Sequence, residues 1–131
     1  MEDNLLNILL VEDDMVDVMN VQRAFKKNNI TNPLYVAHNG LEALNMLKGE
    51  NGVEKLTPTP KIVLLDINMP KMNGSELLRA MRADKNLKSI SVFMMTTSNE
   101  DSDKIEAYSL NVAGYILKPI NFEKFVTAVS T

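Results

Sequence analysis

Five polar residues of the types that handle metal ions and phosphoryl groups lie at the ends of apolar runs in this sequence. They are Glu12, Asp13, Asp66, Thr96 and Lys118. A parallel sheet would gather them along one edge, because the carboxyl ends of its strands meet there. Three carboxylates so gathered repel one another: two unit charges about 4 Å apart cost on the order of 4 kcal/mol at an effective dielectric constant of 20. A raised pKa, a cation or both must offset that cost.

Magnesium suits such an edge, because it binds through one or two carboxylates and keeps several waters. We therefore predict an Mg²⁺ site at Asp13 and Asp66. A metal there would neutralise charge and orient a phosphoryl group, toward which a carboxylate is a competent nucleophile. Thr96 offers a hydroxyl donor and Lys118 an ammonium group to phosphoryl oxygens. The five residues thus supply a nucleophile, metal ligands, a hydrogen-bond donor and a counter-charge.

Positioning these residues requires strands and helices in alternation, and the sequence has that pattern. Short apolar runs bounded by turn residues are typical of buried strands, and we expect strands at residues 7–11, 34–37, 62–66, 90–95 and 113–117. Apolar residues at helical spacing follow each run. The predicted inward positions are Met15, Val18, Met19, Val21 and Phe25; Leu41, Ala43, Leu44 and Leu47; Leu77, Leu78 and Met81; Ile105, Tyr108 and Leu110; and Phe122, Phe125, Val126 and Val129. Alternation at this spacing predicts an α/β domain with a parallel sheet, helices on both faces and right-handed crossovers.

Residues that favour helix caps and turns separate these elements. Asp14, Ser75 and Asp101 are predicted to cap the first, third and fourth helices. Asn39-Gly40 is predicted to turn the chain, and Gly49–Lys61, with two glycines and two prolines, is predicted to be a surface loop.

The composition points to a single domain in the cytoplasm. The chain has 131 residues, and we expect one domain over 1–131 with its core at about 7–129. No cysteine is present, which excludes disulfides and thiolate chemistry. The formal charge of −3 argues against a nucleic-acid surface, and no apolar run is long enough to cross a membrane.

Four motifs, taken together in order and spacing, make the chain resemble the receiver domain of two-component response regulators, which has the CheY-like fold. The motifs are "ILLVEDD", "IVLLDINMPKMNG", "FMMTTS" and "GYILKP". The resemblance implies a doubly wound five-stranded parallel sheet with strand order 2-1-3-4-5. It also implies a phosphoacceptor signalling domain rather than an enzyme, with only self-phosphorylation and autodephosphorylation chemistry.

The resemblance assigns roles to individual residues. Asp66 is the phosphoacceptor, and the Mg²⁺ ligands are Asp13, Asp66, the main-chain carbonyl of Asn68 and, through water, Glu12. Thr96 and Lys118 bind the phosphoryl group, while Thr96 and Tyr115 are the switch residues. Asn68 and Ser98 occupy positions that tune the lifetime of the acyl phosphate, and the Lys118-Pro119 bond is expected to be cis.

The implied partner is a sensor histidine kinase or a histidine phosphotransfer protein. The long loop and the "TTS" sequence resemble the stand-alone receivers that partner phytochromes, so a phytochrome kinase is the expected donor. The surface made by the fourth helix, fifth strand and fifth helix is expected to change on phosphorylation and could form a homodimer. No direct contact with nucleic acid or membrane is expected.

Three other functions compete with this interpretation. A phosphohydrolase of the haloacid dehalogenase type would need a second aspartate two residues after the nucleophile, where this chain has Asn68. A flavodoxin-like cofactor binder would need a first loop that accepts a phosphate, and Glu12-Asp13-Asp14 would repel it. A phosphate-independent interaction module of the same fold needs none of the site residues. His38, the single histidine, is expected to be an ordinary surface residue, and Tyr35 a packing residue.

Overall fold

Strands and helices alternate along the chain as the sequence predicts. The computed structural model describes residues 6–67, 72–96 and 112–117. The elements are β1 (Ile8–Val11), α1 (Met15–Lys27), β2 (Leu34–Ala37), α2 (Gly40–Lys48), β3 (Ile62–Asp66), α3 (Gly74–Ala83), β4 (Ser91–Thr96) and β5 (Gly114–Leu117). The strands form one sheet in the order β2-β1-β3-β4-β5, and every neighbouring pair is parallel. The predicted fold class and strand order are confirmed.

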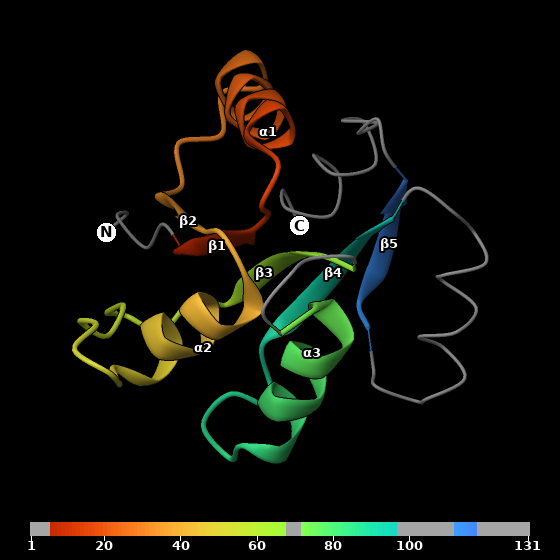
Figure 1. Cartoon of the computed structure of the whole chain (residues 1–131). Helices are drawn as coiled ribbons and strands as arrows, with labels where there is room; N and C mark the ends of the chain where they lie inside the picture. Colours follow the sequence, from red (N-terminus) through yellow and green to blue (C-terminus); the bar gives the residue numbers. More distant parts are fainter. Residues whose placement is uncertain (1–5, 68–71, 97–111, 118–131) are drawn as a thin grey trace.

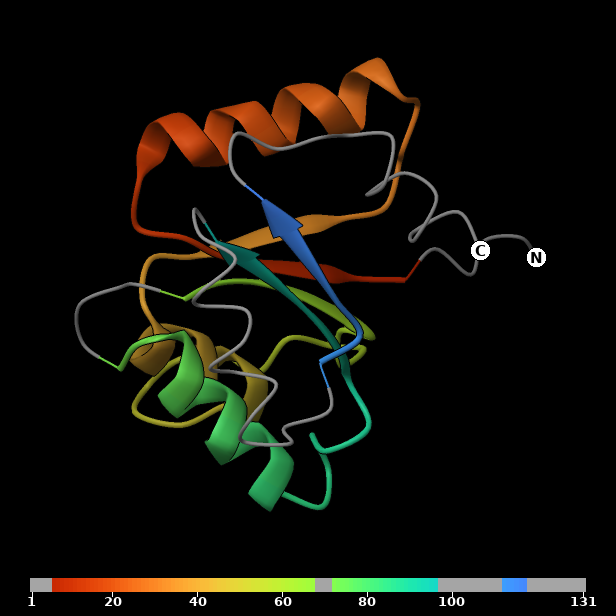
Figure 2. The ribbon, with the colours of Figure 1, turned by 90° about the vertical axis from the view of Figure 1, so that its right-hand side faces the viewer.

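Helices cover both faces of the sheet: α1 lies on one face, and α2 and α3 lie on the other (Figure 1 and Figure 2). Successive residues of β1 therefore pack in different core clusters. Ile8 and Leu10 pack in the cluster with α1, whereas Leu9 and Val11 pack in the larger cluster with α2 and α3. All four are fully buried. Burial on both faces explains why the strands are continuous apolar runs rather than alternating ones.

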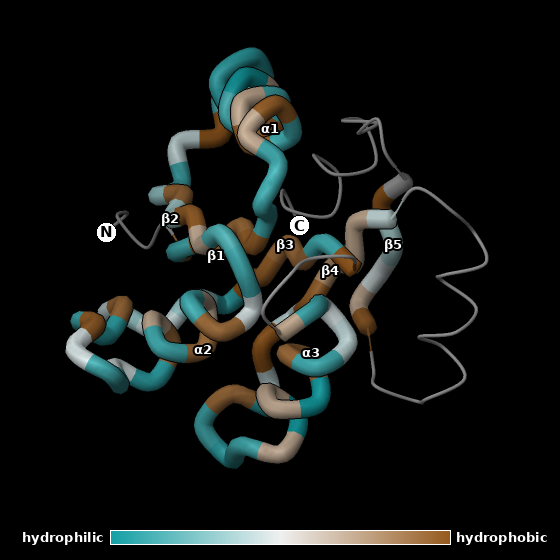
Figure 3. Tube along the Cα trace, in the orientation of Figure 1, coloured by the Kyte–Doolittle hydropathy of each residue, from teal (hydrophilic) through white to brown (hydrophobic). Residues whose placement is uncertain are grey.

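The distribution of hydropathy follows this layering. Brown, apolar segments run through β3 and β4 in the middle of the molecule, while much of α1 and part of the loop after α2 are teal (Figure 3). The core facing α1 consists of Ile8, Leu10, Val18, Val21, Phe25, Leu64, Met95 and Ile116.

Three of the predicted inward positions are wrong. The relative exposures of Met15, Met19 and Leu41 are 56%, 47% and 45%. In α1 the buried stripe runs through Val18, Val21 and Phe25, and Met15 and Met19 fall on its flank because each residue advances about 100° around the helix. The apolar pattern was wider than the face that the sheet covers.

The predicted cap of α3 is also wrong, and the predicted turn before α2 is a cap. Asn73, not Ser75, caps α3: its side chain accepts from the N–H of Glu76 at 3.0 Å, and its own N–H donates to the Glu76 carboxylate at 2.9 Å. This reciprocal pair requires a glutamate three residues after the cap, a spacing that Asn73 has and Ser75 lacks. Asn39 caps α2 by accepting from the N–H of Glu42 at 2.8 Å.

β2 and β3 have the predicted bounds, and the other three strands differ from the prediction by one residue. β1 and β5 begin at Ile8 and Gly114, one residue late, and β4 is shifted to Ser91–Thr96. That shift places Thr96 inside the strand. The segment Gly49–Lys61 is a loop as predicted, and its middle is tied to α2 by the N–H of Leu56, which donates to Met46 O at 2.9 Å.

No helix among residues 6–67, 72–96 and 112–117 combines the length and the apolar character that crossing a bilayer demands. The predicted fourth and fifth helices, at Asp101–Leu110 and from Asn121 onward, lie outside the described residues.

Candidate functional site: an acidic edge of the sheet

The three acidic residues singled out by the sequence meet at the carboxyl edge of the sheet. Parallel pairing sets Val11 of β1 opposite Leu65 of β3, so the next residue on each strand, Glu12 and Asp66, is level with the other. Asp13 follows Glu12 directly. One carboxylate oxygen from each of Glu12, Asp13 and Asp66 lies within 4.8 Å of the other two. The topology therefore brings together acids that are more than fifty residues apart in the chain.

These carboxylates differ in their exposure to solvent. Glu12 is fully buried and Asp66 has 7% relative exposure, whereas Asp13 is exposed. Carboxylates held this close repel one another, and burial strengthens the repulsion, so the arrangement favours a bound cation. Their oxygens are hard donors, the kind that Mg²⁺, Ca²⁺ and Mn²⁺ prefer. The donor set thus fits a divalent metal ion, with two ligands at the base and one facing solvent.

Local hydrogen bonds hold Glu12 in place at the end of β1. Its N–H continues the ladder to β2 by donating to Ala37 O at 2.9 Å, and its Oε2 accepts from the N–H of Asp14 at 3.1 Å. Asp14 in turn caps α1, because its Oδ1 accepts from the N–H of Val16 at 2.8 Å and of Asp17 at 3.4 Å. The predicted cap is confirmed. The three acidic residues therefore have different roles: Asp14 caps α1, and Glu12 and Asp13 lie at the site.

Asp66 is the last residue of a central strand and is held from both sides. It pairs in register with Met95 of β4, and the N–H of the next residue, Ile67, donates to Met95 O at 3.2 Å. The carbonyl of Ile67 accepts from the N–H of Gly74 at 3.0 Å. The backbone that carries the carboxylate is thus fixed by the sheet and by the start of α3.

Two further predicted site residues lie in the neighbouring strands. Thr96 ends β4, one residue past the partner of Asp66, and has 1% relative exposure. Tyr115 in β5 is partly buried and packs against the larger core cluster. Asn68, Ser98 and Lys118, with the Lys118-Pro119 bond, lie outside the described residues.

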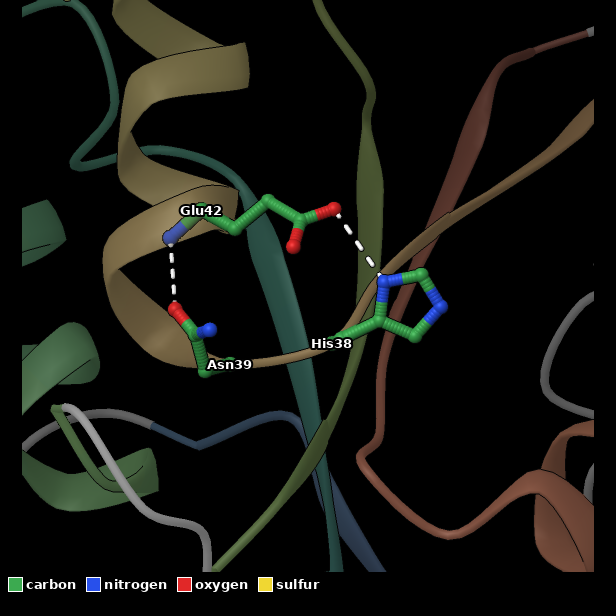
Figure 4. A network of polar contacts seen from close by, with 3 residues as sticks. All are labelled: His38, Asn39 and Glu42. Atoms are coloured by element: carbon green, nitrogen blue, oxygen red, sulfur yellow. Dashed lines mark hydrogen bonds and ion pairs between the residues drawn. The ribbon is translucent and has the colours of Figure 1, made fainter.

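His38 lies at the end of β2, on the same side of the sheet as the acidic edge. Its side chain is 53% exposed and its Nδ1 lies 3.3 Å from Oε1 of Glu42, one turn into α2 (Figure 4). The same view shows the side chain of Asn39 below Glu42, where its oxygen accepts from the N–H of Glu42. His38 is a surface residue as predicted. Tyr35, which was expected to pack, has 37% relative exposure instead, because β2 is an edge strand of the sheet.

One feature of this edge was not predicted from the sequence. The N–H of Gly40, at the start of α2, donates to the carbonyl of Met72, in the segment between β3 and α3, at 3.0 Å. Asn39-Gly40 was interpreted as a simple turn. The only local signal of its role is a cap residue followed by a glycine, and that signal does not identify the contact with Met72.

Comparison with known proteins places this chain in a family. The profile of the response regulator receiver domain matches residues 8–130. In sequence, the chain is 37% identical over 116 residues to the response regulator Rcp1 of Synechocystis sp., which covers 88% of this chain and 78% of that protein.

Solved structures give the same result. The bacteriophytochrome response regulator RtBRR superposes with a TM-score of 0.89 at 38% identity, covering 96% of this chain and 76% of that one. The Mn²⁺-bound form of Rcp1 has a TM-score of 0.77 at 35% identity, and the phosphorylated cyanobacterial phytochrome response regulator RcpA has 0.78 at 31%. Each covers 95% of this chain and 88% of the other.

Proposed function

The chain belongs to the family of response regulator receiver domains of two-component signal transduction, and on that premise we propose that it accepts a phosphoryl group on Asp66 from the phosphohistidine of a partner kinase. The convergence of Glu12, Asp13 and Asp66 within 4.8 Å is the observation that carries this proposal. Receiver domains act with histidine kinases, so the class of partner follows from the family.

We assign the metal of this site as Mg²⁺. Asp13 and Asp66 would bind it directly, Glu12 through a water molecule, and the main-chain carbonyl of Asn68 would complete the protein ligands. When bound, the ion neutralises the carboxylates and the incoming phosphoryl oxygens. The burial of Glu12 and Asp66 supports this assignment, since it strengthens every electrostatic interaction at the edge.

The transfer itself is carried by Asp66. One of its carboxylate oxygens forms a bond to phosphorus while the phosphorus–nitrogen bond of the donor breaks. The other ring nitrogen of the phosphohistidine carries a proton, so the donor nitrogen leaves with the bonding pair as a neutral imidazole. Thr96 and Lys118 donate hydrogen bonds to the phosphoryl oxygens, and Asn68 and Ser98 influence how long the acyl phosphate lasts.

Phosphorylation would be read out through the strands next to Asp66. Thr96 is buried beside the acceptor, and Tyr115 is partly buried in the next strand. New charge-assisted contacts draw Thr96 toward the phosphoryl group, and Tyr115 turns into the space that this opens. The equilibrium between two conformations of the surface around β5 shifts as a result. This surface could also carry a homodimer.

The relatives suggest which kinase supplies the phosphoryl group. RtBRR and RcpA are response regulators of phytochromes by name, and both superpose on nearly the whole chain. We therefore propose a phytochrome histidine kinase as the donor. A phosphate-independent interaction module of the same fold is the alternative, and the experiment below separates the two.

The test is phosphorylation of the wild type and of Asp66→Asn by radiolabelled cognate kinase or by acetyl phosphate, with Mg²⁺ present. Wild type should be labelled and Asp66→Asn should not, because an amide cannot attack phosphorus. Asp14→Asn is the matched control: it makes the same chemical change two residues from Glu12, keeps a good helix cap, and should be labelled like wild type. No labelling of the wild type would favour the alternative, whereas labelling of Asp66→Asn would show that Asp66 is not the acceptor.

A further inference from the structure

The start of α2 touches the segment that follows Asp66 through backbone alone. The N–H of Gly40 donates to Met72 O at 3.0 Å. Two residues after Met72, the N–H of Gly74 donates to Ile67 O, also at 3.0 Å. Gly40 and Gly74, the first residues of α2 and α3, therefore make backbone hydrogen bonds to Met72 and Ile67, both between β3 and α3.

Neither glycine has room for a side chain. A Cβ atom at position 40 would overlap the carbonyl oxygen of Met72 and lie 2.9 Å from its Cγ. A Cβ atom at position 74 would overlap the carbonyl oxygen of Asp66 and lie 2.9 Å from Cα of Ile67. Real Cβ atoms do not come this close to backbone atoms, so the absence of a side chain is required at both places.

Met72 is held in a conformation that non-glycine residues seldom adopt. Its φ is +67°, in the left-handed region. Such a conformation persists only where the surroundings determine it. Here the Met72 side chain packs against the larger core cluster, and its carbonyl accepts from Gly40. The start of α2 is thus part of what fixes Met72.

We propose that Gly40 is a positioning residue for the acidic edge: its contact with Met72 fixes the residues that lead into α3, and through Gly74 and Ile67 it sets the position of the Asp66 carboxylate. This inference rests on the proposed function, because it concerns the metal affinity and reactivity of the same site. Gly40 touches neither the metal nor the phosphoryl group in this scheme, and it acts through Met72.

A rigid path connects the two places. Asn73, between Met72 and Gly74, is locked to Glu76 by the reciprocal hydrogen bonds that cap α3. A push on the Met72 carbonyl is therefore carried through Asn73 to the start of α3, and through the hydrogen bond between Gly74 and Ile67 to the backbone beside Asp66. A Cβ atom at position 40 would produce that push.

The variant Gly40→Ala tests this proposal, because two physical effects predict opposite results. Alanine is the better helix former, so if only helix propensity mattered the variant would be more stable than wild type. The contact with Met72 predicts the reverse. We expect Mn²⁺ binding, measured by the loss of the free-ion electron paramagnetic resonance signal, to weaken about tenfold, as for residues that support metal ligands. Phosphorylation by acetyl phosphate should slow about as much or more, because small misplacements of a nucleophile are costly.

Gly52→Ala is the matched control for a general loss of stability. Gly52 has φ +80° and no atom within 4 Å of the position a Cβ would take, in the loop after α2. The change strains the backbone without touching the acidic edge. It should lower the melting temperature and leave Mn²⁺ affinity unchanged.

The outcomes separate the proposal from the function on which it rests. If wild type binds no Mn²⁺ and takes no phosphoryl group, the proposed function fails and the inference fails with it. If wild type does both and folded Gly40→Ala matches its affinity and rate, the inference alone is overturned. If Gly40→Ala does not fold, Met72→Ala tests the proposal instead, because it removes the side chain that packs residue 72 against the core. Weakened Mn²⁺ binding by Met72→Ala supports the proposal, and unchanged binding contradicts it.

Discussion

The two edges of the sheet treat buried polar groups in different ways. At the amino edge, Asn7 has 5% relative exposure and is neutral. Its side-chain amide donates to Pro58 O at 2.8 Å, and its main-chain carbonyl accepts from the N–H of Lys61 at 3.4 Å. Asn7 therefore connects the long loop to the start of β1. At the carboxyl edge, the buried side chains of Glu12 and Asp66 are both acidic, and a carboxylate oxygen of each lies within 4.8 Å of the other.

Charged groups at the amino edge are also matched. Nη1 of Arg82 donates to Lys88 O at 2.7 Å and to Ile90 O at 3.0 Å, and partial burial lowers the pKa of its guanidinium. Nζ of Lys48 lies 3.6 Å from Oδ2 of Asp84. One edge therefore uses polar groups to close the architecture, and the other concentrates negative charge that a ligand can use. The comparison teaches that acidic side chains gather at the site, whereas the described polar groups of the amino edge bind carbonyl groups or an opposite charge.

A divalent cation should distinguish the two edges most strongly. At about one hundred times its Kd, Mg²⁺ should raise the free energy of unfolding of wild type by about 2.7 kcal/mol, because it binds only the folded protein. The increment should be smaller in Glu12→Gln and unchanged in Asn7→Ala. Urea unfolding with and without Mg²⁺ measures it. An equal increment in Glu12→Gln would show that the stabilisation does not arise at the acidic edge.

Removing the Asn7 side chain at the amino edge should lower the stability of the fold without changing the acidic edge. Asn7→Ala leaves the carbonyl of Pro58 without its donor in a partly buried place, so we expect a loss of about 2 kcal/mol in the free energy of unfolding. Mn²⁺ affinity and phosphorylation should stay at wild-type levels. Asn32→Ala is the control: its amide donates to Leu6 O at 2.9 Å in an exposed place, and the loss there should be smaller. A fall in Mn²⁺ affinity of Asn7→Ala would mean that the edges are coupled.

The smallest effect concerns a neutral residue at the carboxyl edge itself. Asn73→Ala removes the cap of α3 and should cost about 1 kcal/mol by thermal or urea unfolding. Ser75→Ala should cost almost nothing, because Ser75 is the second residue of the helix and not its cap. The reverse order of the two losses would restore the cap that the sequence first suggested.

The strands and the acidic edge could be predicted because the sequence signals of the strands are local, and the topology of a parallel sheet brings the strand ends together. Ile62–Asp66 is apolar until its last residue, and parallel pairing alone brings Asp66 to Glu12. The faces of the helices were harder. Met15 and Met19 are as apolar as their buried neighbours, and only the width of the packed face decides which of them is covered.

The contact between Gly40 and Met72 could not be predicted, for a different reason. It joins the backbone at the start of α2 to the backbone just before α3, and backbone atoms are the same in nearly every residue. A glycine in the sequence shows that a side chain is not needed there. It does not show which distant carbonyl occupies the space, so only the fold identifies the partner.

The three described helices, α1, α2 and α3, all begin at the edge where the strands end, with Asp14, Asn39 and Asn73 as their first caps. Each amino terminus carries a partial positive charge of about half an elementary charge from its aligned peptide dipoles. The carboxylates thus sit at the positive pole of a polarised scaffold. The field of the helix termini makes the edge less repulsive to an incoming dianion than the number of its acids suggests. Salt should weaken this effect of the helix dipoles only slightly where the groups are buried.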